Sequence, residues 1–344
     1  MIDRLIQNAP EEVVTNGQMN YGNYNSPFRK VNLLDATIVP SLFKDLQLRE
    51  WQAFQILGPG CFVFMSIYDT KKVSIVQCIT YDLNTGEKHK FERKLLPGVV
   101  QLPNGLYGTK AEYRTTDVLM RVDHDLDEDL LQIEVDIREG KNRPCISMSL
   151  TANHDVEYYQ PMVTVMPLKG NRGIYTHKAM LPVEGTLEVE GRLYNLEEDV
   201  SSLIIDDHKG FYPYITKYDW VTGLGFLTEG ERFGFNLTDN QVIDQEQYNE
   251  NCVWLDGVLH PLPPVEFKRS KGKLGSWYIY DQEGRVDLTF KPSINNEVKT
   301  NLLLMESRYE GPYGYFSGSF TLADGQTIPF ENIFGVGEKF YLRG

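Results

Sequence analysis

The chain has 344 residues, and its 48 acidic and 34 basic side chains give a formal net charge of −14 with histidine counted neutral. This negative balance argues against nucleic acid as a partner, because phosphate neutralisation needs clustered Lys and Arg. A composition of 41% hydrophobic and 24% charged residues is typical of globular chains. Tyr (20) outnumbers Phe (17), which favours β-sheet.

The sequence has no apolar stretch near the roughly 18 residues that a membrane span needs. The first nine residues also lack the apolar core of a secretory signal, so we expect a cytoplasmic protein. The four cysteines are scattered, without a pair at zinc or redox spacing, which predicts free thiols. They are Cys61, Cys78, Cys145 and Cys252.

Alternation of apolar and polar residues predicts antiparallel strands along most of the chain. The clearest case, residues 131–138, puts four apolar side chains on one face and four polar ones on the other. Similar alternation recurs at 146–151, 233–237, 286–291 and 316–322. Turns containing glycine separate these segments, so the chain is predicted to be a series of hairpins.

Helical signals are few, with short helices expected only within residues 42–52 and 244–250. So many strands need barrel closure or sandwich packing to protect their edges, which predicts a mainly β fold. The Pro- and Gly-rich segment 161–185 is interpreted as a crossover between two β halves. It divides the chain into an N-terminal β domain, residues 1–185, and a C-terminal one, residues 186–344.

The densest polar and aromatic cluster lies in residues 201–223. On an extended strand Asp206 and Asp207 point to opposite faces, so only one is expected to enter an interior, where desolvation raises its pKa. We predict Asp206 as a proton donor with His208 beside it; the alternative is a solvated turn in which His208 caps backbone groups. The aromatic wall would comprise Tyr212, Tyr214 and Trp220.

Other ionisable or amide residues in strand-like surroundings are Lys178, Asn236, Glu250, Asn251, His260 and Glu338. The tendency of lysine to stay in water favours an outward-facing Lys178, whereas an inward one would need a partner. Glu250 and Asn251 could line a site or simply close a loop. Adjacent residues such as 206–208 rarely converge on one ion, so we expect no metal, and no motif indicates a cofactor.

Several segments together resemble the bacterial family catalogued as domain of unknown function 2804, over nearly the whole chain. They are residues 49–54, 175–178, 206–220, 234–237, 250–251, 256–260, 286–292 and 325–338. The family's central motif is matched by Asp206, Gly210, Phe211, Pro213 and Tyr214. Lys209 stands where the family usually has Arg, and Tyr212 where it has Trp. Lysine lacks the planar fork of arginine, so the bidentate contact of an arginine is not expected at this position.

The family is distantly similar to hydroxyneurosporene synthase (carotenoid hydratase) and to AttH-like proteins. The resemblance implies two tandem antiparallel lipocalin-like β-barrels, or barrel or sandwich halves. It also implies an apolar small molecule as ligand, held in an aromatic-lined barrel or at the interface.

Three hypotheses of function follow. In the first, a lyase (hydratase), isomerase or cyclase protonates a C=C bond of an isoprenoid- or polyketide-like substrate. Asp206 is then the acid, His208 or Lys178 tunes its proton, and aromatic faces stabilise positive charge. Ligand contacts are expected from Tyr212, Tyr214, Trp220, Asn236, Glu250 and Asn251. The alternatives are a non-catalytic carrier and a carbohydrate-active enzyme. The oligomeric state is left open.

Overall fold

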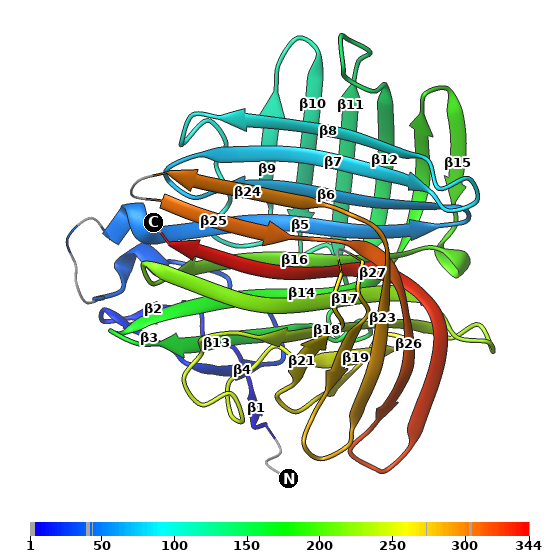
Figure 1. The fold of residues 1–344 in the computed structure, drawn as a ribbon. Coiled ribbons are helices and arrows are strands. Elements are labelled where there is room, and N and C mark those ends of the chain that lie inside the picture. Colours follow the sequence, from blue (N-terminus) through cyan, green and yellow to red (C-terminus); the bar gives the residue numbers. More distant parts are fainter. Residues whose placement is uncertain (1–3, 39–41, 43, 273, 303–304, 344) are drawn as a thin grey trace.

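The computed structural model describes residues 4–38, 42, 44–272, 274–302 and 305–343 (Figure 1). Helical structure in these ranges consists of three 3-10 turns, η1 (Leu33–Asp35), η2 (Lys44–Gln47) and η3 (Glu198–Val200). The mainly β fold is therefore confirmed. The helix expected within residues 42–52 is limited to η2, because a long strand begins at Leu48, and the one expected at 244–250 is replaced by turns.

The first sheet contains the order β8-β7-β6-β5-β16-β14-β12-β11-β10-β9, and each neighbouring pair is antiparallel. The bounds are β5 (Leu48–Gly58), β6 (Cys61–Asp69), β7 (Ser74–Asp82), β8 (Lys88–Leu95), β9 (Thr109–Arg114), β10 (Val118–Asp125), β11 (Leu130–Ile137), β12 (Ile146–Asn153), β14 (Arg172–Val189) and β16 (Ser202–Phe211). Strands β1 (Ile6–Gln7), β4 (Gly22–Tyr24), β13 (Met162–Leu168) and β15 (Arg192–Leu196) extend it, and β2 (Val14–Thr15) and β3 (Gln18–Met19) form a separate ribbon.

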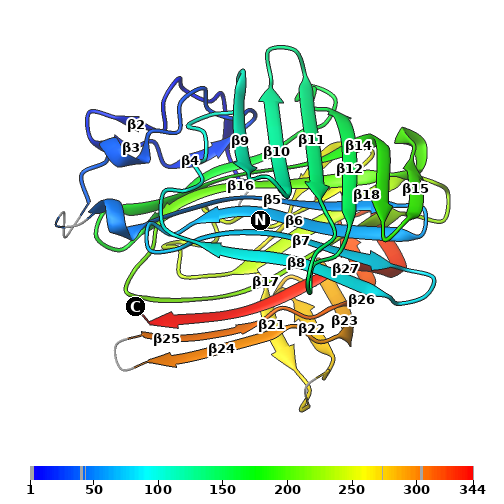
Figure 2. The same cartoon turned by 90° about the horizontal axis from the view of Figure 1, so that it is seen from above.

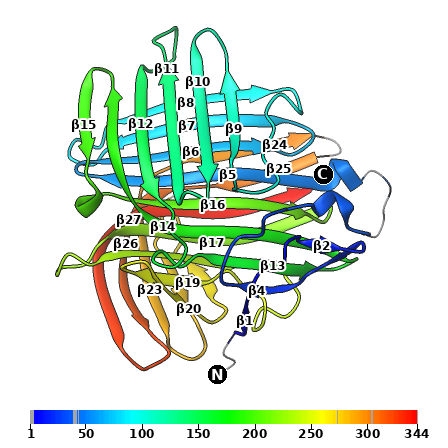
Figure 3. The same cartoon turned by 180° about the vertical axis from the view of Figure 1, so that it is seen from behind.

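The second sheet contains the order β20-β19-β18-β17-β27-β26-β23-β22-β21, with β25 pairing to β27 and β24 to β25. Its strands are β17 (Ile215–Phe226), β18 (Arg232–Asp239), β19 (Cys252–Leu255), β20 (Val258–Pro261), β21 (Glu266–Arg269), β22 (Trp277–Tyr280), β23 (Val286–Ile294), β24 (Glu297–Leu302), β25 (Met305–Glu310), β26 (Tyr313–Thr321) and β27 (Thr327–Arg343). Figures 2 and 3 show how both sheets curl, so that the protein is two tandem antiparallel half-barrels, as expected.

Three of the apolar clusters show how the two sheets pack. One lies inside the first sheet and another inside the second. The third joins Met180 and Ile204 of the first sheet to Trp220, Trp254 and Phe334 of the second, so it forms an interface between the sheets. Apolar burial on this scale couples the two halves energetically.

Strand β16 explains why simple alternation does not describe the centre of the molecule. Leu203 and Ile205 face the core of the first sheet, whereas Ile204 faces the interface, and every residue of β16 is buried. Asp206 and Asp207 are consequently both buried, on opposite faces. The expectation that only one of them enters an interior is wrong, because this strand has an interior on each side.

The segment 161–185 is not a crossover between two β halves, so that interpretation is wrong. It forms β13 and most of β14, a hairpin inside the first sheet. The chain changes sheet later, between the end of β16 at Phe211 and the start of β17 at Ile215. A division into domains at residue 185 stays a prediction, but it would cut β14.

Candidate functional site

A buried lysine lies at the centre of the interface between the sheets. Lys178 on β14 faces Asp206 on β16 in the strand register. Its Nζ donates a hydrogen bond of 2.8 Å to Oδ2 of Asp206 and lies 3.4 Å from Oε2 of Glu250. Lys178 is only 2% exposed, so the preference for an outward-facing lysine is wrong. Two carboxylates compensate for its desolvation.

Charge and burial act in opposite directions on this group. Burial lowers the pKa of Lys178, but Asp206 and Glu250 outweigh it and leave that pKa above its usual value. Burial raises the pKa of Asp206, and the ammonium of Lys178 opposes that rise. Lys178 therefore remains a cation at neutral pH, held between an aspartate from one sheet and a glutamate from the other.

Trp220 and Asn236 of the second sheet complete the surroundings of Lys178. The Trp220 ring centroid lies 5.2 Å from Nζ, within range of a cation–π contact. The indole Nε1 donates to Oδ1 of Asn236 at 2.7 Å, and Nδ2 of Asn236 donates to the backbone carbonyl of Glu250 at 2.8 Å. This chain of contacts joins the aromatic wall to the loop that carries Glu250.

His208 faces the same interface, two residues after Asp206. Its ring stacks on Trp51 at a centroid distance of 3.9 Å, and its Nε2 shares a hydrogen bond of 2.6 Å with the Tyr212 hydroxyl. The guanidinium of Arg49 lies over the Tyr212 ring. Burial holds the pKa of His208 well below its usual range, so its imidazole is neutral. His208 thus anchors an aromatic stack beside Asp206.

Glu338 is a further acidic group at the interface to which the sequence assigned no role. It pairs in register with Trp220, and its carboxylate accepts hydrogen bonds from Tyr218 at 3.2 Å and Tyr309 at 2.7 Å. Burial, with a smaller contribution from Asp206, raises the pKa of Glu338 to about 6. Its sequence signals were a charged residue within a strand-like segment and its place at the end of segment 325–338, which carries part of the family resemblance.

Two predicted site residues remain, Tyr214 and Asn251. Tyr214 is 59% exposed and lies outside the buried cluster. Asn251 is buried, but its amide closes the loop, because Oδ1 accepts from the Thr238 amide and Nδ2 donates to the Pro263 carbonyl. Asp207 faces the core of the first sheet and accepts a hydrogen bond from Gln52.

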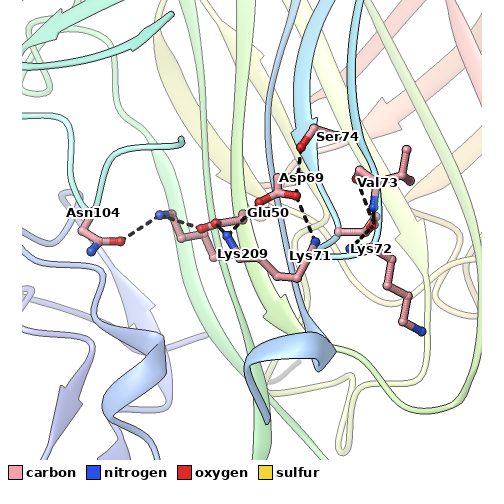
Figure 4. Close-up of polar contacts among 9 residues, drawn as sticks. Glu50, Asp69, Lys71, Lys72, Val73, Ser74, Asn104 and Lys209 are labelled. Carbon is pink, nitrogen blue, oxygen red and sulfur yellow. Dashed lines mark hydrogen bonds and ion pairs between the residues drawn. The ribbon is translucent and has the colours of Figure 1, made fainter. Parts of the chain in front are cut away.

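Lys209, in the position of the family's usual arginine, also points into the first sheet (Figure 4). Its Nζ lies 3.0 Å from Oε2 of Glu50 and donates to Oδ1 of Asn104 at 3.0 Å. Glu50 pairs in turn with Lys71, which lies 2.9 Å from Asp69. Lys209 thus ties β16 to β5 and to the loop before β9 through two separate contacts.

In the described ranges no group of three or more His, Cys, Asp or Glu side chains is arranged to hold a metal ion. The helices described there include none long and apolar enough to cross a membrane.

The fold and this cluster define a protein of two tandem lipocalin-like half-barrels with ionisable groups buried between them. The chain belongs to the family described as domain of unknown function (DUF2804), which matches residues 5–343. The resemblance found in the sequence is thereby confirmed. No curated protein matches the chain.

Solved structures with a similar fold share little sequence with this chain. CghA is 12% identical with a TM-score of 0.51, and the match covers 86% of this chain and 88% of CghA. Kievitone hydratase from Nectria haematococca is 12% identical, with a TM-score of 0.49 over 86% and 88% of the two chains. The AttH-like protein NE1406 from Nitrosomonas europaea is 12% identical, with a TM-score of 0.47 over 88% and 97%. At this identity the likeness to CghA shows a shared fold alone.

Proposed function

We propose that this protein is an acid–base enzyme of the hydratase, isomerase or cyclase type that acts on an apolar, unsaturated small molecule at the interface between the sheets. The observation that carries the proposal is the burial of Asp206, Lys178 and Glu250. The aromatic side chains of Trp51, Trp220 and Tyr212 lie beside them. Clusters of desolvated, mutually coupled ionisable groups are typical of catalytic sites. CghA, which has a similar fold, has also been solved with Sch210972.

Asp206 is the proton donor in this proposal. Its Oδ2 is held by Lys178. No described group makes a well-aligned hydrogen bond to its Oδ1, although the Trp51 indole is near enough to favour the carboxylate. In the resting protein Asp206 is the carboxylate that pairs with Lys178. Because burial raises its pKa, Oδ1 takes up a proton from solvent before the reaction, while Glu250 continues to balance the charge of Lys178. Transfer of this proton to an alkene carbon converts the π bond into a C–H bond and leaves a carbocation, while Asp206 becomes a carboxylate.

The cation formed in this step has three outcomes. Loss of a neighbouring proton gives an isomer, attack by water followed by loss of a proton gives a hydrate, and attack by a second C=C bond gives a ring. Each route ends with a proton returned to a base, either Asp206 or Glu338. The faces of Trp51, Trp220 and Tyr212 would stabilise the cation.

Solvent reaches part of this region. Trp51, Tyr212, Tyr218, Tyr309 and Glu338 are partly exposed, whereas Lys178, Asp206 and Glu250 are buried. We infer that a substrate approaches past the aromatic side chains. The site then has a dry inner end at Asp206 and an outer end, at the aromatic side chains, that solvent reaches. This arrangement suits a reaction in which water attacks one intermediate only.

A pair of adjacent variants tests the proposal. Asp206→Asn keeps the shape of the side chain but removes its acid, so turnover of a substrate found by screening is expected to fall by roughly 10²- to 10⁴-fold. Asp207→Asn changes the neighbouring carboxyl, which faces the other interior, and is the matched control. Both variants are compared by kcat/KM at constant pH. Equal activity of Asp206→Asn and wild type would refute the mechanism, and binding without turnover in the wild type would indicate a carrier.

A further inference from the structure

Lys178, Asp206 and Glu250, here called the Lys178 cluster, join the two sheets. The position of the Glu250 carboxylate in this cluster depends on the loop that carries it. This loop connects β18 to β19 in the second sheet, whereas Lys178 and Asp206 belong to the first sheet. Three consecutive backbone carbonyls of the loop, at residues 249–251, accept hydrogen bonds from side chains. Asn236 of the second sheet bonds the middle one, at Glu250.

The two outer carbonyls are held by one arginine from the start of the chain. Nη1 of Arg4 donates to the Asn249 carbonyl at 2.6 Å, and Nη2 donates to the Asn251 carbonyl at 2.5 Å. Nη2 also lies 3.3 Å from the Leu262 carbonyl. The planar fork of arginine suits such a contact, because its parallel N–H groups reach two acceptors at once.

Arg4 lies just before a strand of the first sheet, although its partner carbonyls lie in loops of the second. It precedes β1, which pairs with β4, and β4 pairs with β13 of the first sheet. A second contact follows the same path, since Nδ2 of Asn23 on β4 donates to the Gln247 carbonyl at 3.1 Å. The N-terminal segment 4–24, which is attached to the sheet that carries Lys178, therefore binds the loop 247–251 through hydrogen bonds.

We propose that Arg4 is a positioning residue, and that the N-terminal segment is a strap that holds Glu250 beside Lys178. Arg4 acts through the backbone on either side of Glu250, which fixes where that carboxylate can lie. Burial lowers the pKa of Arg4 to about 10, so the guanidinium stays charged at neutral pH and donates charge-assisted bonds. This role of Arg4 does not depend on catalysis by Asp206; only the purpose of the Lys178 cluster rests on the proposed function.

Cys252 reports on the strap without any substrate. Cys252 directly follows the loop 247–251 and is fully buried. Because burial strongly raises the pKa of its thiol, Cys252 is expected to resist alkylation. In Arg4→Ala the loop is released, and iodoacetamide labelling of Cys252 is expected to accelerate by about tenfold or more as local opening increases. Cys61 and Cys78, buried in the first sheet, are expected to stay protected. Labelling is read by peptide mass spectrometry in a Cys145→Ser background, which removes the exposed thiol.

The matched control is Arg29→Ala, which removes an arginine that lies just outside the segment 4–24 and pairs with the exposed Asp127. Its Cys252 labelling is expected to equal that of the wild type. Unchanged Cys252 protection in Arg4→Ala would overturn the proposal. A parallel rise at all three buried thiols would also overturn it, because it would show general destabilisation instead of a released loop.

A second readout measures the position of Glu250 itself. Because Glu250 contributes to the raised pKa of Lys178, its withdrawal in Arg4→Ala is expected to lower the Lys178 pKa, followed by NMR of ¹³C-labelled lysine. Free guanidinium at low concentration is expected to restore both the labelling rate and this pKa, whereas Arg4→Lys restores them only in part. An unchanged Lys178 pKa would contradict the role of Arg4. These measurements need no turnover, so their failure is distinct from failure of the proposed enzymatic activity.

Discussion

Lys178 shows how single residues make this interface both costly and specific. A buried ammonium is tolerated only with close partners, and here each sheet supplies one carboxylate, Asp206 from the first and Glu250 from the second. The sequence identified these three residues as candidates for a site, together with Trp220 and Asn236. Their contacts were not predictable, because period-2 alternation assigns one buried face to a strand, and β14 and β16 have two.

Glu338 gives a pH dependence with a definite sign. Its folded-state pKa of about 6 exceeds the ordinary 4.5, so the folded protein binds this proton more tightly than the unfolded chain does. The resulting stabilisation is complete below pH 4.5 and is lost as the pH rises through 6. Glu338→Gln stays neutral, so its free energy of unfolding relative to wild type is expected to rise by at most about 2 kcal/mol over this range.

Urea unfolding at several pH values measures this difference. Glu331→Gln, on an exposed position of the same strand, is the control and is expected to follow the wild type. A constant difference between Glu338→Gln and wild type from pH 4 to 8 would show that Glu338 titrates normally.

At the scale of elements, a glycine in β18 lies at a close contact between the two sheets. A Cβ at Gly234 would lie 2.6 Å from Sδ of Met180 in β14, so a larger residue there would have to displace the Met180 side chain. Hairpins and turns were predictable because their signals are local. This contact was not, since nothing in either segment indicates the other as its neighbour.

Gly234→Leu is expected to destabilise the protein by about 1–3 kcal/mol through overpacking. Met180→Ala should relieve part of that cost, because it removes the side chain that the new leucine meets. The double-mutant cycle is measured by urea unfolding, and a coupling energy of at least about 0.5 kcal/mol is expected. Strictly additive effects would mean that the two sheets do not meet at this point.

The whole molecule is held together by pairings that are distant in sequence. Strand β16 lies between β5 and β14, so the first sheet closes only after residues 202–211 have been added. The mainly β class and the family could be predicted from local patterns and motif order. The point where the chain changes sheet could not, because the Pro- and Gly-rich segment resembles a linker but forms a hairpin.

We expect a single cooperative unfolding transition, because the apolar interface couples the two half-barrels. A fragment of residues 1–185 is expected not to fold, since it ends inside β14 and lacks β16. Calorimetry of the full chain and circular dichroism of the fragment test these expectations. Two separate transitions, or a folded fragment, would instead support a domain boundary at residue 185.

Proton transfer to carbon is the central claim, and deuterium incorporation measures it most directly. Unsaturated compounds are first selected that bind the wild type and bind Trp220→Ala more weakly. They are then incubated with the protein in D₂O and analysed by mass spectrometry. The account predicts deuterium at carbon with wild type and with Asp207→Asn, and its loss with Asp206→Asn. A compound bound at this site that gains no deuterium, or gains it equally with Asp206→Asn, would contradict the account.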